Sequence, residues 1–172
     1  MAGDQPGAPR WLSTTERESW LSITELVTTL PGALDTRMQQ QAGITFYEYM
    51  VMAMLSENEE RTLQLSDLAE LTSGSLSRLS HVLTRLERQG WVERARSPHN
   101  PRARVATLTD AGMDKVRVTA PLHVNDVRSL IFDALDPRQV TELAEILAPV
   151  IERIRPPGQR PPSGRGVGVG LP

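Results

Sequence analysis

The side chains best suited to bind a partner gather on one predicted helix, over residues 75–89. Four leucines recur there at helical spacing and predict a buried stripe, namely Leu76, Leu79, Leu83 and Leu86. Outside this stripe or at its margins stand Ser75, Ser77, Arg78, His81 and Arg85. Side chains of these types can read base edges when a helix enters the major groove, and the free N–H groups of its first turn can face a phosphate. The plain alternative is a solvated helix face.

Positive charge is concentrated in the same part of the chain. Ser73 to Ala106 holds seven Arg and two Glu, a net charge of +5, although the whole chain carries −2. A localised basic patch favours a phosphate-bearing partner, and we expect double-stranded DNA. Ser73, Asn100 and Arg104 are added to the candidate DNA-binding residues. Arg85, Arg94 and Arg96 are expected to contact phosphates, and Arg102 is expected to enter an A·T-rich minor groove.

Other kinds of chemistry find little support in the sequence. The chain has no Cys, and His81, His99 and His123 are too dispersed to predict a zinc site. Nucleophile-elbow, dinucleotide-binding and phosphate-loop motifs are not found, so we expect no catalytic residues, no metal and no cofactor. Because no membrane span or signal peptide can be identified, we expect a cytoplasmic protein.

Hydrophobic spacing predicts the elements that come first in the chain. Apolar residues from Trp20 to Leu34 recur every three or four positions, which predicts a helix that Pro31 and Gly32 should kink or break. Thr45 can cap a second helix that reaches Glu57. Ser66 is the expected cap of a third, short helix.

The pattern changes after the candidate groove-reading helix. The runs WVERAR and RVATLT read as two strands joined by a turn rich in Pro and polar residues, and together they predict a hairpin. A long helix should follow from Thr109 to about Phe132, bent at Pro121, and a last one should begin at Asp136 and Pro137. A short helix, a turn, a polar helix and a hairpin, in this order, are typical of a winged helix-turn-helix.

The run from Ile44 to Gly112 resembles the MarR family of bacterial transcriptional regulators, with the segments RLERQGWVER and TLTDAG at the expected distance. The resemblance implies a mainly α fold with a small antiparallel β wing, in which helices at both chain ends dimerise. The expected organisation is a flexible N-terminus (1–12), a helical dimerisation region (13–43 and 110–155), a winged helix-turn-helix (44–109) and a disordered tail (156–172). The family's wing commonly carries Asp, any residue, Arg, where this chain has Asn100, Pro101 and Arg102.

Function follows from the same resemblance. We expect a homodimeric repressor that binds an inverted-repeat operator and is released by a small aromatic or phenolic effector. Core packing is the plainer role for each candidate effector-binding residue, and these candidates are Trp20, Tyr47, Tyr49, Met54, Arg117 and His123. For His123 a surface position is favoured. The alternative function is a winged-helix module that binds an acidic protein partner.

Overall fold

The computed structural model describes residues 9–97, 100 and 102–154. The predicted disordered tail and His99 therefore lie outside the described residues. The chain divides into two compact units, Met1–Ala33 and Leu34–Pro172. None of the described helices combines the length and the continuous apolar character that crossing a membrane requires.

The helix α1 (Thr14–Ala42) begins in the first unit and ends in the second. Where the sequence predicted a kink or a break, at Pro31 and Gly32, the helix does not break, because it continues through both residues. Most of its large apolar side chains in the first unit are exposed; Trp20, for example, has 57% of its surface open to solvent. From residue 14 to Ala33 the helix therefore has an apolar face that no described residue of the same unit covers.

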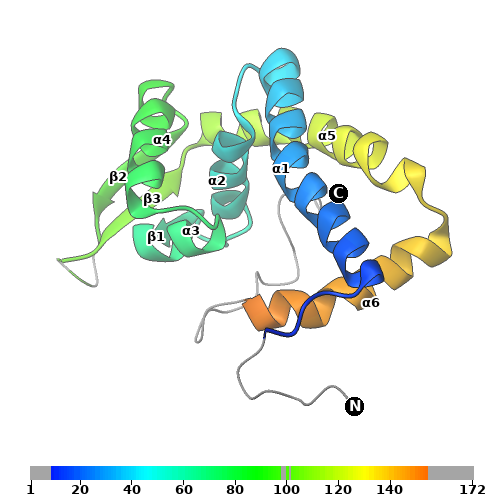
Figure 1. Cartoon of the computed structure of the whole chain (residues 1–172). Coiled ribbons are helices and arrows are strands. Elements are labelled where there is room, and N and C mark those ends of the chain that lie inside the picture. The colour runs from blue at the N-terminus through cyan, green and yellow to red at the C-terminus, as the bar shows by residue number, and fades with distance from the viewer. Residues whose placement is uncertain (1–8, 98–99, 101, 155–172) are drawn as a thin grey trace, which may run out of the picture. The chain divides into compact units, whose positions relative to one another are not determined.

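The second unit is built around α2 (Phe46–Ser56), which is labelled in Figure 1. Most of the side chains of α2 are buried. Thr45 caps this helix in a capping box: the Thr45 hydroxyl accepts from the Glu48 backbone N–H, and the Glu48 carboxylate accepts from the Thr45 backbone N–H. The helices α4 (Leu76–Arg88) and α5 (Asp110–Leu130) contribute Leu79, Leu83 and Val116 to the same core. The predicted cap at Thr45 is confirmed.

The helix α3 (Leu65–Leu71) precedes α4 in a helix-turn-helix. The predicted cap at Ser66 is wrong, since Gln64 stands at the N-cap and the Ser66 hydroxyl instead donates to Asp67. The helix starts earlier because Gln64 is also the last residue of a short strand, which pairs with Val105 and leads directly into Leu65.

The wing is an antiparallel hairpin of β2 (Val92–Arg96) and β3 (Arg104–Leu108), as predicted. A third strand, β1 (Thr62–Gln64), was not predicted, and it pairs with β3 to give the strand order β1-β3-β2. Three residues are too few for strand periodicity to be recognised, which explains why the sequence did not reveal it.

The C-terminal part of the described chain consists of α5, a short 3-10 helix (Phe132–Ala134) and α6 (Pro137–Ile154). Asp136 and Gln139 exchange hydrogen bonds at the start of α6, where the side chain of each accepts from the backbone N–H of the other. No residue of α6 is buried in the described structure. Its apolar residues Ile146, Val150 and Ile154 are exposed.

Candidate nucleic-acid interface

The helix α4 presents the polar face that the sequence predicted. Ser75 is its N-cap and accepts a hydrogen bond from the Arg78 backbone N–H at 3.2 Å. Ser77, Arg78, His81 and Arg85 are exposed, whereas Leu79, Leu83 and Leu86 are buried. Leu76 departs from the predicted stripe, because 59% of its surface is exposed. The three buried leucines therefore anchor α4 in the core, while its side chains that can form hydrogen bonds face solvent.

Tyr47, on α2, contacts residues on both sides of the turn that leads into α4. The Arg78 guanidinium lies 4.1 Å from the centre of the Tyr47 ring, within range of a cation–π interaction. The Tyr47 and Thr72 hydroxyls share a buried hydrogen bond of 3.0 Å. Ser73 has a positive φ of 49°, and it lies exposed on this turn. Tyr47 therefore supports the turn before α4.

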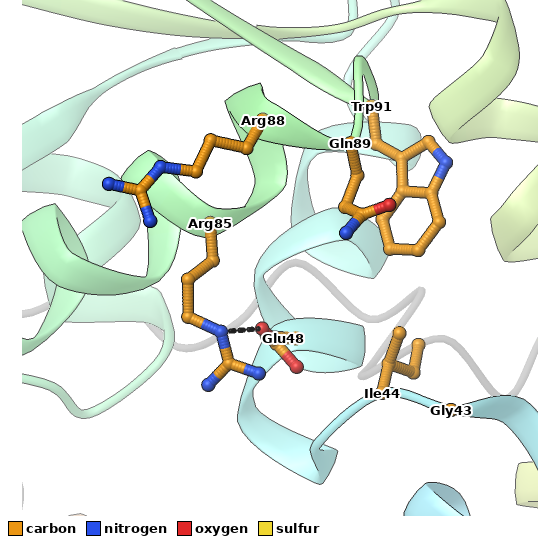
Figure 2. A pocket seen from close by; sticks show the side chains of 7 residues that line it. All are labelled: Gly43, Ile44, Glu48, Arg85, Arg88, Gln89 and Trp91. Carbon is orange, nitrogen blue, oxygen red and sulfur yellow. Dashed lines mark ion pairs between the residues drawn. The ribbon is translucent and has the colours of Figure 1, made fainter.

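The Arg85 guanidinium pairs with the buried carboxylate of Glu48. Figure 2 shows the ion pair between Arg85 and Glu48 as a dashed line. The Arg85 Nε lies 3.1 Å from Glu48 Oε1, and the Glu48 side chain is only 4% exposed. The pair borders a pocket of about 310 Å³ between the start of α2 and the end of α4, lined by Gly43, Ile44, Glu48, Arg85, Arg88, Gln89 and Trp91. Because the Arg85 side chain is 61% exposed, it can still reach solvent or a phosphate.

Arg94, on β2, has several partners on α4. Its guanidinium forms an ion pair with Glu87 and donates to the Thr84 hydroxyl at 3.0 Å. Its backbone N–H donates to Glu87 Oε1 at 3.1 Å. Hydrogen bonds from the Arg94 side chain are the main cause that lowers the pKa of Glu87. Unlike the other wing arginines, Arg94 is largely enclosed, with 20% of its side chain exposed.

The described part of the wing tip is open to solvent. Arg96, Arg102 and Arg104 are exposed, and among the described residues their side chains form no hydrogen bond or ion pair. The Asn100 side-chain oxygen accepts from the Arg102 backbone N–H at 3.0 Å, an arrangement typical of Asn in turns. Asn100 therefore holds the backbone of Arg102, while the Arg102 guanidinium has no partner among the residues that the structure describes.

Of the candidate effector-binding residues, Tyr49 and Met54 are buried in the core, Trp20 is exposed in the first unit, and Arg117 is exposed and paired with Asp114. The predicted surface position of His123 is wrong, because its ring packs 4.8 Å from that of Tyr49 and 5.6 Å from that of Phe46. A residue on the inner face of a long helix need not be apolar, and the aromatic neighbours of His123 lie on another helix, so they could not be recognised from the sequence.

Burial also shifts the ionisation of this aromatic cluster. Desolvation lowers the pKa of His123 in spite of nearby Asp126, and it raises the pKa of Tyr49 to about 12, with a further contribution from Glu57. Three buried polar atoms on α5 have no hydrogen-bond partner among the described residues: Thr119 Oγ1, His123 Nδ1 and Asp126 Oδ2. This side of α5 therefore has unused capacity for hydrogen bonding.

Sequence reasoning missed two acidic residues that organise the interface, Glu48 and Glu87. Glu48 could have been found, because Thr45 followed three residues later by Glu48 matches a capping box. Glu87 carried no such signal, since its partner lies on a strand that reaches it only through the fold.

Comparisons with known proteins agree with this architecture. A model of the MarR family matches residues 42–103. The chain is similar to Sco3205, a MarR family transcriptional regulator from Streptomyces coelicolor solved in complex with DNA: identity is 39%, the TM-score is 0.82, and the match covers 92% of this chain and 99% of that one. AbsC, another MarR family regulator of that organism, is 37% identical with a TM-score of 0.78, covering 86% of this chain and 99% of that one.

Among curated proteins, the HTH-type transcriptional regulator YfiV of Bacillus subtilis is 33% identical over 99 residues. That match covers 58% of this chain and 60% of YfiV. The transcriptional repressor MprA of Escherichia coli is 25% identical over 118 residues, covering 69% of this chain and 66% of MprA. The matches therefore span less than two thirds of the length of these curated relatives.

Proposed function

The chain belongs to the MarR family of transcriptional regulators, and on that premise we propose that it binds operator DNA with α4 in the major groove and the wing in the minor groove. The observation that carries this proposal is the exposed polar face of α4, where Ser77, Arg78 and His81 stand over buried leucines. Arg96 and Arg102 extend the same cationic surface along the wing. Base contacts from α4 would give specificity, and phosphate contacts from Arg side chains would give most of the affinity.

The acting form in this proposal is a homodimer on an inverted repeat. Each unit supports it separately: α1 exposes Trp20 and Val27, and α6 exposes Ile146, Val150 and Ile154. Apolar faces of this extent are typical of surfaces that a partner covers. Two recognition helices would then have to meet successive major grooves about 34 Å apart.

The protein is further proposed to act as a repressor that a small aromatic or phenolic effector releases. Support comes from α5, where the ring of buried His123 packs on that of Tyr49 and where His123 Nδ1 and Asp126 Oδ2 have no hydrogen-bond partner in the described part of the chain. A ligand that prefers the DNA-incompetent dimer by about tenfold at each of two sites would weaken DNA binding about a hundredfold. Operator DNA must then weaken ligand binding by the same total factor.

The direct test is fluorescence anisotropy on DNA taken from upstream of the chain's own gene, at several salt concentrations. Each phosphate contact should add about −0.9 to the slope of log K against log salt. Arg78→Ala should cost about 1–3 kcal/mol on the operator and relax the preference at one base position. Arg117→Ala, which also removes one exposed arginine but on α5, should leave binding unchanged. Equal losses on operator and random DNA would make Arg78 a phosphate contact instead.

A further inference from the structure

One arginine of the wing is turned inward onto the recognition helix. We propose that Arg94, together with Glu87, is a positioning residue that sets the angle of the wing against α4, and that it does not contact phosphate. The inference rests on the proposed function, because it assumes that the wing contacts DNA.

The contacts of Arg94 form a continuous seam along α4. Its partners Ser80, Thr84 and Glu87 recur at helical spacing, so they lie on one side of the helix. Thr84 donates its hydroxyl hydrogen to the Ser80 carbonyl at 3.0 Å and keeps its oxygen lone pairs for the Arg94 guanidinium. The Ser80 hydroxyl, at 3.5 Å, is at the long limit of a hydrogen bond. The Arg94 guanidinium, the Thr84 hydroxyl and the Glu87 carboxylate therefore each have a partner within the seam.

Glu87 ties down both the backbone and the side chain of the same strand residue. One carboxylate oxygen accepts from the Arg94 backbone N–H, and the other pairs with its guanidinium. A carboxylate that bonds two nitrogen atoms of one residue restrains both the direction of β2 and its distance from α4. The two bonds cannot both be kept if the strand rotates relative to the helix.

Arg96 provides the comparison within the same strand. It lies two residues along β2 and therefore on the same face, yet it is exposed and has no side-chain partner among the described residues. Nearer the start of β2, Val92 is buried in the core and anchors the strand by packing. Arg94 thus lies between the packed start of β2 and the exposed wing tip. A small change in the angle between β2 and α4 displaces the tip, with Arg102, more than it displaces the start of the strand.

The test is a double-mutant cycle measured as DNA affinity. Arg102→Ala should weaken binding about tenfold in the wild type, and less than about twofold once Arg94→Met has freed the wing. The matched control is Arg96→Met, which removes one charge from the same face, and in this background Arg102→Ala should keep its full effect. If both backgrounds retain the full effect, Arg94 does not position the wing.

Glu87→Gln separates positioning from simple electrostatics by the sign of its effect. Removing a negative charge close to DNA should strengthen binding if only charge matters. Loss of the ion pair should weaken it if Glu87 orients the wing. Arg94→Lys gives a second contrast: a lysine keeps the charge of a phosphate contact but lacks the fork that reaches Thr84 and Glu87 together. It should therefore resemble Arg94→Met, and near wild-type affinity would overturn the proposal.

A measurement without DNA keeps the inference separate from the proposed function. The chain has no cysteine, so spin labels at Ser77→Cys and Asn100→Cys are site-specific. With labelled chains diluted in unlabelled protein, the distance distribution should broaden in Arg94→Met but not in Arg96→Met. Circular dichroism checks that each variant is folded. If the distances respond while Arg102→Ala leaves the wild-type affinity unchanged, the wing is positioned by Arg94 but the proposed groove contact is wrong. Equal distributions in both variants would refute the positioning role.

Discussion

Replacing Gly74 by alanine tests the support beneath the recognition helix. A Cβ at Gly74 would lie 1.9 Å from the Tyr47 hydroxyl oxygen and 2.8 Å from the ring carbon that bears it. Real Cβ atoms do not approach other atoms so closely, so the ring must move. Tyr47 is 9% exposed and hydrogen-bonded to Thr72, which leaves it little room to do so.

The expected cost combines two effects. Moving the ring loses the buried hydrogen bond to Thr72, at about 0.5–1.5 kcal/mol, and forcing a methyl group into a packed site costs about 1–3 kcal/mol. Gly74→Ala should therefore lower the free energy of unfolding by about 2–4 kcal/mol. DNA affinity should also fall, since Tyr47 lies under the Arg78 guanidinium.

Urea unfolding followed by circular dichroism gives the stability, at one fixed protein concentration because a dimer's stability depends on it. Tyr47→Phe removes the atom that the new methyl group meets first and should cost about 1 kcal/mol alone. Combined, the two substitutions should cost about 1 kcal/mol less than the sum of their separate effects. Gly32→Ala is the control, because nothing lies within 4 Å of a Cβ there and a helix interior favours alanine. A Gly74→Ala protein as stable as the wild type, or strict additivity with Tyr47→Phe, would refute the reasoning.

Three further outcomes are expected. Arg102→Ala should weaken DNA binding mainly on sites with A·T-rich flanks, whereas Asn100→Asp should keep or improve affinity by offering the Arg102 guanidinium a carboxylate. Competition assays on pairs of DNA sites with and without such flanks decide this. A larger loss for Asn100→Asp than for Arg102→Ala would mean that Asn100 itself touches DNA. Burial lowers the pKa of His123 below its ordinary value of 6.5, so protonation is penalised in the folded state and stability should fall as the pH drops below that value. Urea midpoints between about pH 7 and pH 5 should therefore vary less in His123→Phe than in the wild type, and identical profiles would contradict this assignment. Leu147→Asp on α6 should dissociate the proposed dimer by placing a charge on an exposed apolar face, as measured by light scattering. A mass equal to that of a wild-type dimer would remove α6 from the interface.

The sequence was most informative where structure depends on local chemistry. Thr45 is a predicted cap whose side chain acts within the next turn, and three of the four leucines of α4 lie buried on the predicted face. The helix is not broken at Pro31, because in a long helix the hydrogen bonds on either side can outweigh the single one that proline removes. Local rules therefore predicted the start of α2, whereas the start of α3 depends on the strand that precedes it.

The candidate site shows the same limit. Exposure of Arg78 follows from the periodicity of the helix, so its type and position were sufficient. Arg94 and Arg96 have the same type and lie on one face of the same strand, yet Arg96 is exposed whereas Arg94 pairs with Glu87 across the fold. The burial of His123 likewise depends on Phe46 and Tyr49, which come from another helix. Residue type indicates what a side chain can bind, but only tertiary packing decides whether it is already occupied.

The strand order of the wing has a consequence for self-association. With β3 in the centre, the two edges of the sheet are β1 and β2. The first edge is only three residues long, and the second carries Glu93, Arg94 and Arg96. Short or charged edges are poor templates for strand addition by another chain. At high local concentration, copies of the protein would therefore resist joining their sheets into aggregates, although the wing arginines Arg96, Arg102 and Arg104 are exposed to solvent.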